Sequence, residues 1–163
     1  SPIEGVRRHA SYAERMTRGF VSACEAAGAS YIVQPTDPSI AGARASVDSM
    51  LALMPDVNAV VVHNEVALPH VIAALREAGR SMPADISVVA VCPENTALAQ
   101  PVPVTSVDLP AETIGRIAVD MVTALMTPGQ PNEVRLLGPV LTDRGSTRSA
   151  VDEAGTNSLT AAR

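Results

Sequence analysis

Two kinds of apolar pattern alternate along the first part of the chain. Apolar residues recur every three or four positions in some stretches, which predicts helices at residues 12–27, 41–54 and 68–75. Short apolar runs separate these stretches and predict strands at residues 30–34, 59–62 and 86–91. The run at 59–62 is uniformly apolar, as expected of a strand whose sheet is covered on both faces. Strands that alternate with helices in this way predict an α/β fold, with a parallel sheet and helices on both sides.

The pattern changes after residue 91. Residues 92–104 are rich in proline and are predicted to form a loop. A helix is expected at about residues 111–127, with Asp108 as its cap and Pro110 in its first turn. Residues 133–144 indicate one or two strands, interrupted at Gly138-Pro139. The small, polar residues 151–163 are expected to form a flexible tail.

Polar side chains follow the predicted strands directly, and these are the candidate site residues. Ligands of parallel α/β sheets bind beyond the carboxyl ends of the strands. Asp37 follows the first strand, Asn64 and Glu65 follow the second, and Cys92 and Glu94 follow the third. Purely structural roles remain open for two of them. Asn64 is a suitable helix N-cap, and Glu65 would interact favourably with the dipole of a helix in whose first turn it lay.

Composition restricts the possible functions. The chain has 163 residues, of which 47% are hydrophobic and 18% charged, with a formal net charge of -5. It contains no apolar run long enough to cross a membrane, and its acidity argues against direct binding of nucleic acid. No catalytic motif, metal-ligand pattern or cofactor fingerprint is present, so we expect neither a metal nor a cofactor. The two cysteines form no spacing motif, which favours a reduced, cytoplasmic setting.

A cysteine-dependent isomerase is one alternative, because Cys92 follows a strand. Such an enzyme needs both thiols to face one substrate. Cys24 falls on the apolar face of the first predicted helix, where cysteine is more often a small core residue. We therefore expect no enzymatic activity, and a Cys92 that is a single thiol rather than half of a disulfide.

Five stretches in order resemble the LacI/GalR family of transcriptional regulators, over about residues 10–150. They are ERMTRGFVSACEAAG (14–28), PDVNAVVVHNEVAL (55–68), GRSMPADISVVAV (79–91), PVTSVDLPAETIGRIAV (103–119) and LLGPVLTDRGSTR (136–148). The resemblance implies the C-terminal part of an effector-binding domain, with a fold like that of type I periplasmic binding proteins. In that fold, a parallel sheet flanked by helices forms the second lobe, and crossover elements belong to the first lobe.

The resemblance also implies roles for the candidate residues. An Asn at the position of Asn64 faces the effector in this family, and Asp37 falls where the family often has a residue of the pocket wall. A family arginine that holds ligand hydroxyls or a carboxylate corresponds to Met16, and a one-residue shift of the helix start would bring in Arg15 instead. A sugar-binding Asp is replaced here by Cys92, and Glu94 is the candidate to take over its role.

The resemblance further implies how the chain is divided and what it binds. Residues 1–104 would form the C-terminal lobe, 105–137 a crossover helix and strand of the other lobe, and 138–150 a return strand. The effector would be a small polar metabolite such as a sugar, and the domain would form a homodimer. Operator DNA would be bound only by an N-terminal domain that this chain does not contain. A sugar-binding protein of an uptake system is the alternative within the same fold.

Overall fold

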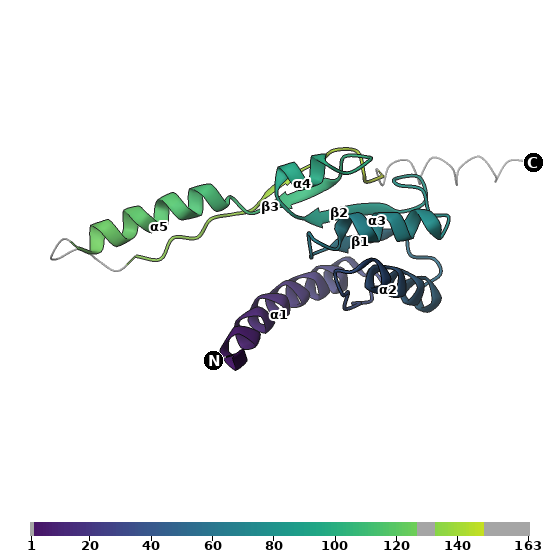
Figure 1. Cartoon of the computed structure of the whole chain (residues 1–163), viewed down its shortest axis with the longest axis horizontal. Coiled ribbons are helices and arrows are strands. Elements are labelled where there is room, and N and C mark those ends of the chain that lie inside the picture. The colour runs from purple at the N-terminus through teal and green to yellow at the C-terminus, as the bar shows by residue number, and fades with distance from the viewer. Residues whose placement is uncertain (1, 127–132, 149–163) are drawn as a thin grey trace, which may run out of the picture. The chain divides into compact units, whose positions relative to one another are not determined.

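The computed structural model describes residues 2–126 and 133–148, which are drawn in colour in Figure 1. The chain divides into two units, Ser1–Pro35 and Thr36–Arg163. The first unit consists of one long helix and the segment after it, and the second contains the sheet. The predicted tail at 151–163 lies outside the described residues.

Helix α1 (Pro2–Ala27) confirms the helix predicted at 12–27 and begins ten residues earlier. It ends at Gly28, whose φ of 65° suits glycine, and the Ala29 amide then donates to the Cys24 carbonyl at 2.9 Å. The strand predicted at 30–34 is wrong, because these residues form no regular element. Tyr31 instead packs edge-on against Phe20, with ring centroids 6.0 Å apart. An apolar pattern favours extended backbone, but only pairing with a neighbouring chain makes it a strand.

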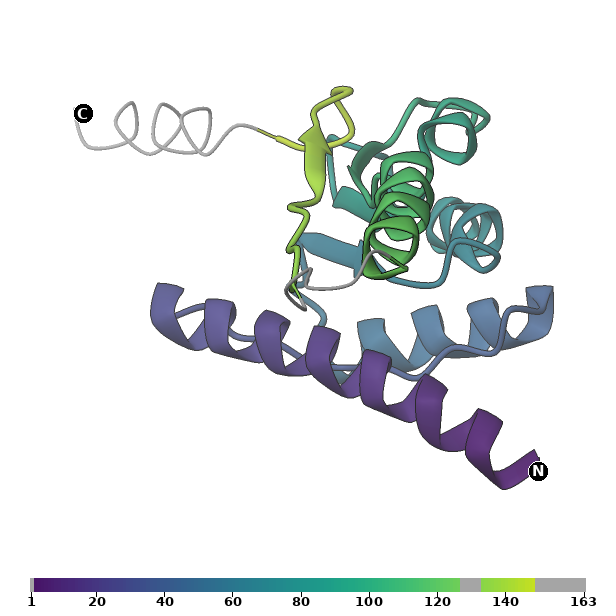
Figure 2. The same cartoon turned by 90° about the vertical axis from the view of Figure 1, so that its left-hand side faces the viewer.

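The second unit contains a four-stranded sheet in the order β1-β2-β3-β4. Strands β1 (Ala59–Val62), β2 (Ser87–Val91) and β3 (Thr105–Asp108) are parallel, and β4 (Val140–Thr142) is antiparallel to β3. Helix α3 (Leu68–Glu77) connects β1 to β2, and α4 (Glu94–Leu98) connects β2 to β3. Figure 2 shows α3 and α4 on the same side of the sheet. Right-handed crossovers that add parallel strands in one direction give this arrangement.

The core lies between the sheet and its helices. Leu68 of α3, Val88 of β2 and the flanking residues Ile86 and Val104 are completely buried. Helix α2 (Ile40–Leu53) packs on α3 and buries Val47 and other residues of its predicted apolar face. The predicted helices at 41–54 and 68–75 and strands at 59–62 and 86–91 are therefore confirmed. Full coverage of the strand at 59–62 is wrong, because the side chain of Val61 is 47% exposed on this edge strand.

Two predictions between residues 92 and 110 are corrected by the structure, and one strand in this range was not predicted. The proline-rich loop contains the short helix α4, which begins directly after Pro93. Residues 105–108 form β3, although their sequence gives only a short mixed run. Asp108 consequently belongs to a strand and does not cap α5 (Ala111–Leu125), whose capping residue is Pro110.

Helix α5 confirms the helix predicted near 111–127, but it has no buried residue. The sequence places an apolar stripe on this helix and predicts that it packs either against another copy of the chain or against the chain's own lobe; its residues are Ile114, Ile117, Met121, Val122 and Leu125. Packing against the chain's own lobe is contradicted, because none of these side chains is buried. Of the one or two strands predicted within 133–144, one is confirmed as β4, and residues 133–139 are irregular. The domain boundaries at residues 104 and 137 remain predictions.

Candidate functional site

The carboxyl ends of the three parallel strands lie at one edge of the sheet. Val62 at the end of β1 is the partner of Ala90 in β2, and Val91 at the end of β2 is the partner of Val107 in β3. The strands therefore end within about two residues of one another in register. The polar residues that follow them are accordingly brought to one edge, as the sequence pattern predicts.

Asn64 and Glu65 lie in the turn between β1 and α3, and both are exposed. The side-chain oxygen of Asn64 accepts a hydrogen bond from the amide of Val66 at 3.1 Å, which fixes this turn. The capping residue of α3 is Ala67, so the structural roles considered for Asn64 as N-cap and for Glu65 in the first helical turn are both wrong. The bond to Val66 uses only the oxygen of the Asn64 amide, whose N–H groups are two further donors.

Cys92 follows β2 directly and is only 4% exposed. Burial raises the pKa of this thiol above its usual value, and the carboxylate of Glu65 adds to the increase. The positive charge of Arg144 partly opposes this increase in pKa, whereas Asp108 adds to it. Glu65 follows β1, Cys92 follows β2 and Asp108 ends β3, so charged groups at the ends of the other two parallel strands affect the pKa of this thiol. Cys92 and Cys24 are both free thiols.

Glu94 is the first residue of α4, and its carboxylate forms an ion pair with Arg144. Nη2 of Arg144 lies 3.2 Å from a carboxylate oxygen of Glu94, and the arginine side chain is 9% exposed while that of Glu94 is 69% exposed. Nη1 of Arg144 donates to the hydroxyl of Ser106 at 2.7 Å. Arg144 and Ser106 were not predicted as site residues. Neither has a local signal in the sequence, because their roles depend on contacts between segments far apart along the chain.

The segment after β4 is fixed to the sheet by hydroxyl groups. Ser146 is completely buried, accepts a hydrogen bond from the Thr105 amide at 2.7 Å and donates one to the Val88 carbonyl at 2.6 Å. The hydroxyl of Thr105 donates to Asp143 at 2.9 Å. Hydrogen bonds from the Gly145 amide and from Thr105 lower the pKa of the Asp143 carboxyl.

Asp37 has a clear structural role before α2. Its carboxylate accepts a hydrogen bond from the Ser39 amide at 2.9 Å, and bonding to Ser39 lowers the pKa of Asp37. Ser39 in turn caps α2 by accepting from the Gly42 amide at 3.0 Å. A Cβ atom on Gly42 would lie 2.5 Å from the Cβ of Asp37, so this close approach requires glycine. The contact between Asp37 and an effector, which the family resemblance implies, remains a prediction.

Arg15 lies on α1 in the first unit and is exposed. Its role in holding a ligand also remains a prediction.

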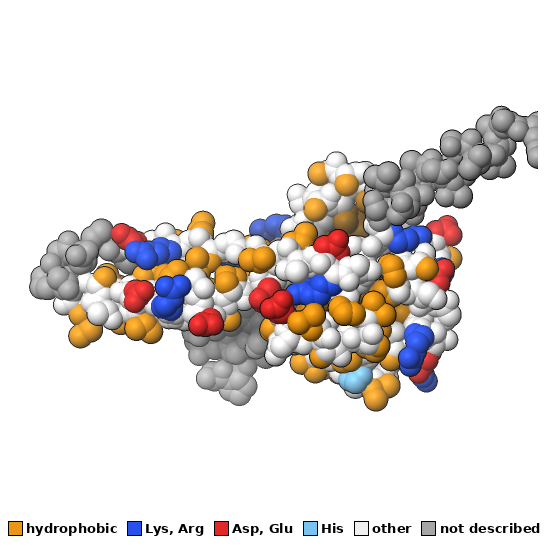
Figure 3. All heavy atoms as spheres, turned by 90° about the horizontal axis from the view of Figure 1, so that it is seen from above, with side chains coloured by type: hydrophobic (Ala, Val, Ile, Leu, Met, Phe, Trp, Pro, Cys, Tyr) orange, Lys and Arg blue, Asp and Glu red, His pale blue; other side chains and the backbone are white. Residues whose placement is uncertain are grey.

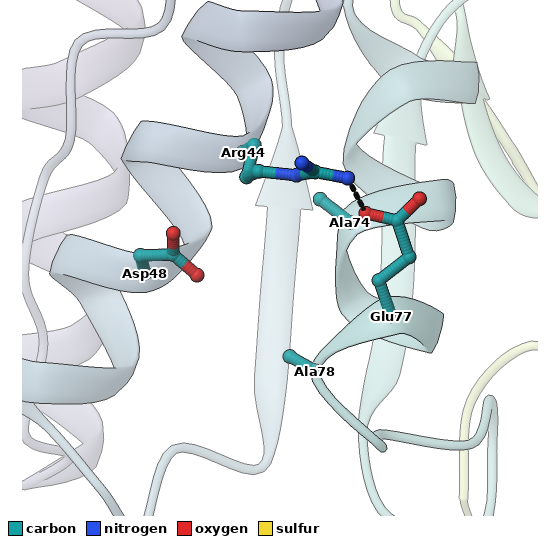
Figure 4. A pocket seen from close by; sticks show the side chains of 5 residues that line it. All are labelled: Arg44, Asp48, Ala74, Glu77 and Ala78. Carbon is teal, nitrogen blue, oxygen red and sulfur yellow. Dashed lines mark hydrogen bonds and ion pairs between the residues drawn. The ribbon is translucent and has the colours of Figure 1, made fainter.

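An open hollow of about 430 Å³ lies between α2 and α3, away from the carboxyl edge. Figure 4 shows Arg44 of α2 reaching across it to form an ion pair with Glu77 of α3. Asp48, Ala74 and Ala78 also line this hollow, and the Arg44 guanidinium is already paired with Glu77. We assign it no ligand.

Within residues 2–126 and 133–148, no group of three or more His, Cys, Asp or Glu side chains could hold a metal ion. No helix in the same ranges is both long and apolar enough to span a membrane.

Comparison with known families and structures gives one family and one fold. Residues 3–147 match a family described as periplasmic binding protein-like domain. No curated protein matches the sequence. The solved complex of the transcriptional regulator CelR with cellobiose is 29% identical with a TM-score of 0.68, over 80% of this chain and 41% of that one.

Two further neighbours have the same fold. A LacI family regulator from Arthrobacter sp. FB24, solved in complex with lactose, is 23% identical with a TM-score of 0.68, over 78% of this chain and 49% of that one. A PurR family regulator from Vibrio parahaemolyticus RIMD 2210633 is 20% identical with a TM-score of 0.73, over 85% of this chain and 52% of that one. The chain thus spans about half the length of these regulators or less.

Proposed function

The chain belongs to the periplasmic binding protein-like domain family, and we propose that it senses a sugar-like effector for a LacI-type transcriptional regulator. The family match and the LacI and PurR regulators among the structural neighbours confirm the resemblance seen in the sequence. The observation that carries the proposal is the polar edge formed at the carboxyl ends of β1, β2 and β3.

The side chains at this edge suit the recognition of hydroxyl groups. Carboxylates such as Glu65 and Glu94 accept hydrogen bonds from hydroxyls, while the amide of Asn64 both donates and accepts. Asn64 and Glu65 are exposed next to the buried end of β1, and Glu94 is exposed two residues after the buried Cys92. This combination of donors and acceptors at one edge of the sheet favours a neutral polyol over a purely apolar ligand. The neighbours solved with cellobiose and lactose suggest saccharides as the first ligands to test.

Effector binding would act by changing how two lobes close on each other in the full-length regulator. Such a change requires the effector to bind one arrangement more tightly than the other. We propose that the regulator is a cytoplasmic homodimer and that operator DNA is contacted through a separate DNA-binding domain. The formal net charge of -5 argues against direct DNA binding by the chain described here.

The buried state of Cys92 supports a binding role rather than a catalytic one. A cysteine nucleophile acts as the thiolate, and burial raises the pKa of Cys92, which favours the neutral thiol. This argues against the alternative of a cysteine-dependent isomerase. The regulators among the neighbours favour a regulator over a sugar-binding protein of an uptake system.

A thermal-shift screen of the full-length protein tests the proposal. The panel contains cellobiose, lactose and monosaccharides, together with nucleosides and sugar acids as other chemical classes. A ligand at one hundred times its Kd stabilises the folded protein by about 2.7 kcal/mol, which is readily measured as a rise in Tm. A rise with at least one neutral saccharide is expected. A rise only with nucleosides or sugar acids, or no rise at all, would contradict the proposal.

Substitutions of Asn64 then locate the site. Asn64→Asp keeps an oxygen that can accept from the Val66 amide, but it removes the two amide donors. Asn64→Ala removes the accepting oxygen as well as the two donors, and it should weaken saccharide binding by roughly 1–3 kcal/mol. If Asn64 contacts the ligand, the Asp variant should also bind more weakly while its unliganded Tm stays close to that of the wild type. Unchanged affinity in both variants would exclude Asn64 from the site.

A further inference from the structure

We propose that Arg144 is a positioning residue that holds the Glu94 carboxylate at the ligand-binding edge and ties it to strands β3 and β4. The inference rests on the proposed function, because Glu94 is a proposed ligand contact. Arg144 itself lies beneath the edge and acts through Glu94 rather than through the ligand.

The guanidinium group of Arg144 is surrounded by acceptors from three elements. Nη1 lies 2.7 Å from the Ser106 hydroxyl in β3 and 3.3 Å from the Thr142 carbonyl in β4. The same nitrogen lies 3.3 Å from the Val104 carbonyl, just before β3. Nη2 faces α4 and the carboxylate of Glu94 at 3.2 Å. One side chain therefore joins the two strands to the residue that begins α4.

Arginine is the residue type that this arrangement requires. Its planar group carries donors on separate nitrogens at fixed directions, so it can serve Ser106 and Glu94 together. A lysine has one nitrogen and a flexible stem, and it cannot reach both acceptors in the same geometry.

The buried position of Arg144 makes this ion pair different from an ordinary surface pair. Exposed ion pairs contribute little, partly because two flexible side chains must be ordered at once. Arg144 is already ordered by its bonds to Ser106 and the strand carbonyls, and only 9% of its side chain is exposed. Only Glu94 has to lose freedom, so the pair fixes the direction of the Glu94 carboxylate at the edge.

The two strands held by Arg144 are also the strands that lead to and from α5. Strand β3 ends at Asp108 before α5, and β4 begins at Val140 after it, with these two residues paired across the ladder. A ligand that pulls on Glu94 would therefore act, through one side chain, on both connecting strands. Effector binding would thereby be coupled to α5, which lies between these two strands along the chain.

The test uses Glu94→Gln, Arg144→Lys, Arg144→Gln and the double variant Glu94→Gln/Arg144→Gln in the full-length protein. Cellobiose affinity is measured by calorimetry, and the Tm is measured without ligand. Glu94→Gln and each Arg144 variant should weaken binding about tenfold or more, as expected for a lost charge-assisted hydrogen bond. The double variant should bind no more than about twofold more weakly than Arg144→Gln, because Glu94 is no longer positioned in that background.

The exposed ion pair of Arg44 and Glu77 provides the matched control. Arg44→Gln and Glu77→Gln, alone and together, should leave cellobiose affinity within twofold of the wild type. Independent, multiplicative losses in the Glu94 and Arg144 variants would overturn the inference, as would wild-type affinity in Arg144→Lys. Arg144→Lys keeps the positive charge, and it decides the matter if Arg144→Gln does not fold.

Hydrogen exchange separates failure of this inference from failure of the proposed function. If the wild-type protein binds no saccharide, the proposed function fails. The connection that Arg144 makes between α4 and strands β3 and β4 is then tested by hydrogen exchange alone. Arg144→Lys should then speed exchange at the amides of Ala97 in α4 and Ala99 directly after it, as well as in β3 and β4, whereas Arg44→Gln should not. Unchanged protection at α4 in Arg144→Lys would overturn the link independently of any ligand.

Discussion

Helices α3 and α5 have similar apolar periodicity and very different surroundings. Leu68 and Leu75 of α3 are at most 2% exposed, because they pack in the core of the second unit. Val119, Val122 and Leu125 of α5 are between 53% and 65% exposed. Figure 3 shows apolar and charged side chains side by side along the surface of α5. The comparison shows that periodicity predicts a helix and its apolar face, but not the partner of that face.

The largest expected effect concerns the exposed stripe of α5. Each large apolar side chain contributes roughly 1.5–3 kcal/mol when fully buried, so a stripe left in water favours association. We expect residues 1–163 alone to form dimers or larger species, with Val122→Glu shifting them towards monomers. Light scattering over a range of protein concentrations measures this. A strict monomer at all concentrations would show that the stripe is stable in water.

The second prediction compares one leucine from each helix. Leu68→Ala should lower the free energy of unfolding by about 2–5 kcal/mol, because it leaves a cavity in the core. Leu125→Ala, the same substitution on α5, should cost less than about 1 kcal/mol. Urea unfolding of the chain at low concentration gives both values. A large cost for Leu125→Ala would mean that α5 is covered in solution.

The third prediction compares two hydroxyl groups. Ser146→Ala removes the bridge between the Thr105 amide and the Val88 carbonyl, so it should cost about 1–3 kcal/mol for leaving buried groups unpaired. Thr123→Ser on α5 keeps a hydroxyl that can bond to the Val119 carbonyl, and it should change stability by no more than about 0.5 kcal/mol. Equal values for the two variants would show that the Ser146 bridge does not stabilise the sheet.

The smallest effect is a change in stability with pH at Asp143. Its folded-state pKa lies below the usual value, so its contribution is fully present above the unfolded pKa and is lost as the pH falls through the folded pKa. Asp143→Asn should therefore reduce the loss of stability on the acid side of about pH 4. Asp120→Asn on α5 corrects for the change in net charge. Parallel acid profiles for wild type and Asp143→Asn would contradict the prediction.

The parts of the fold that sequence could predict are those that local rules determine. Helices α2 and α3 follow from apolar periodicity. Gly28 after α1 and Gly79 after α3 have the positive φ that suits glycine at the end of a helix. Strand β1 follows from an apolar run between α2 and α3, and β2 follows from an apolar run after α3. Residues 30–34 have a similar run but no regular structure, because pairing depends on distant residues.

The candidate site shows the same division. Asn64, Glu65, Cys92 and Glu94 could be predicted because each follows a strand that its own sequence indicates. Arg144 could not, because its importance depends on Ser106 in β3, thirty-eight residues earlier, and on Glu94, fifty residues earlier. No local pattern encodes the approach of segments so far apart along the chain.

The antiparallel pairing of β3 with β4 makes everything between them removable in principle. Asp108 and Val140 are partners in the ladder, so the chain leaves the sheet and returns to it at adjacent points. A two-residue turn such as Asn-Gly can join antiparallel strands at that distance. A shortened gene that replaces residues 109–139 with this turn would keep the buried residues of the sheet and its helices, because α5 contributes none. It would also keep Arg144, Ser106 and Glu94 together on a miniature lobe small enough for rapid study by NMR.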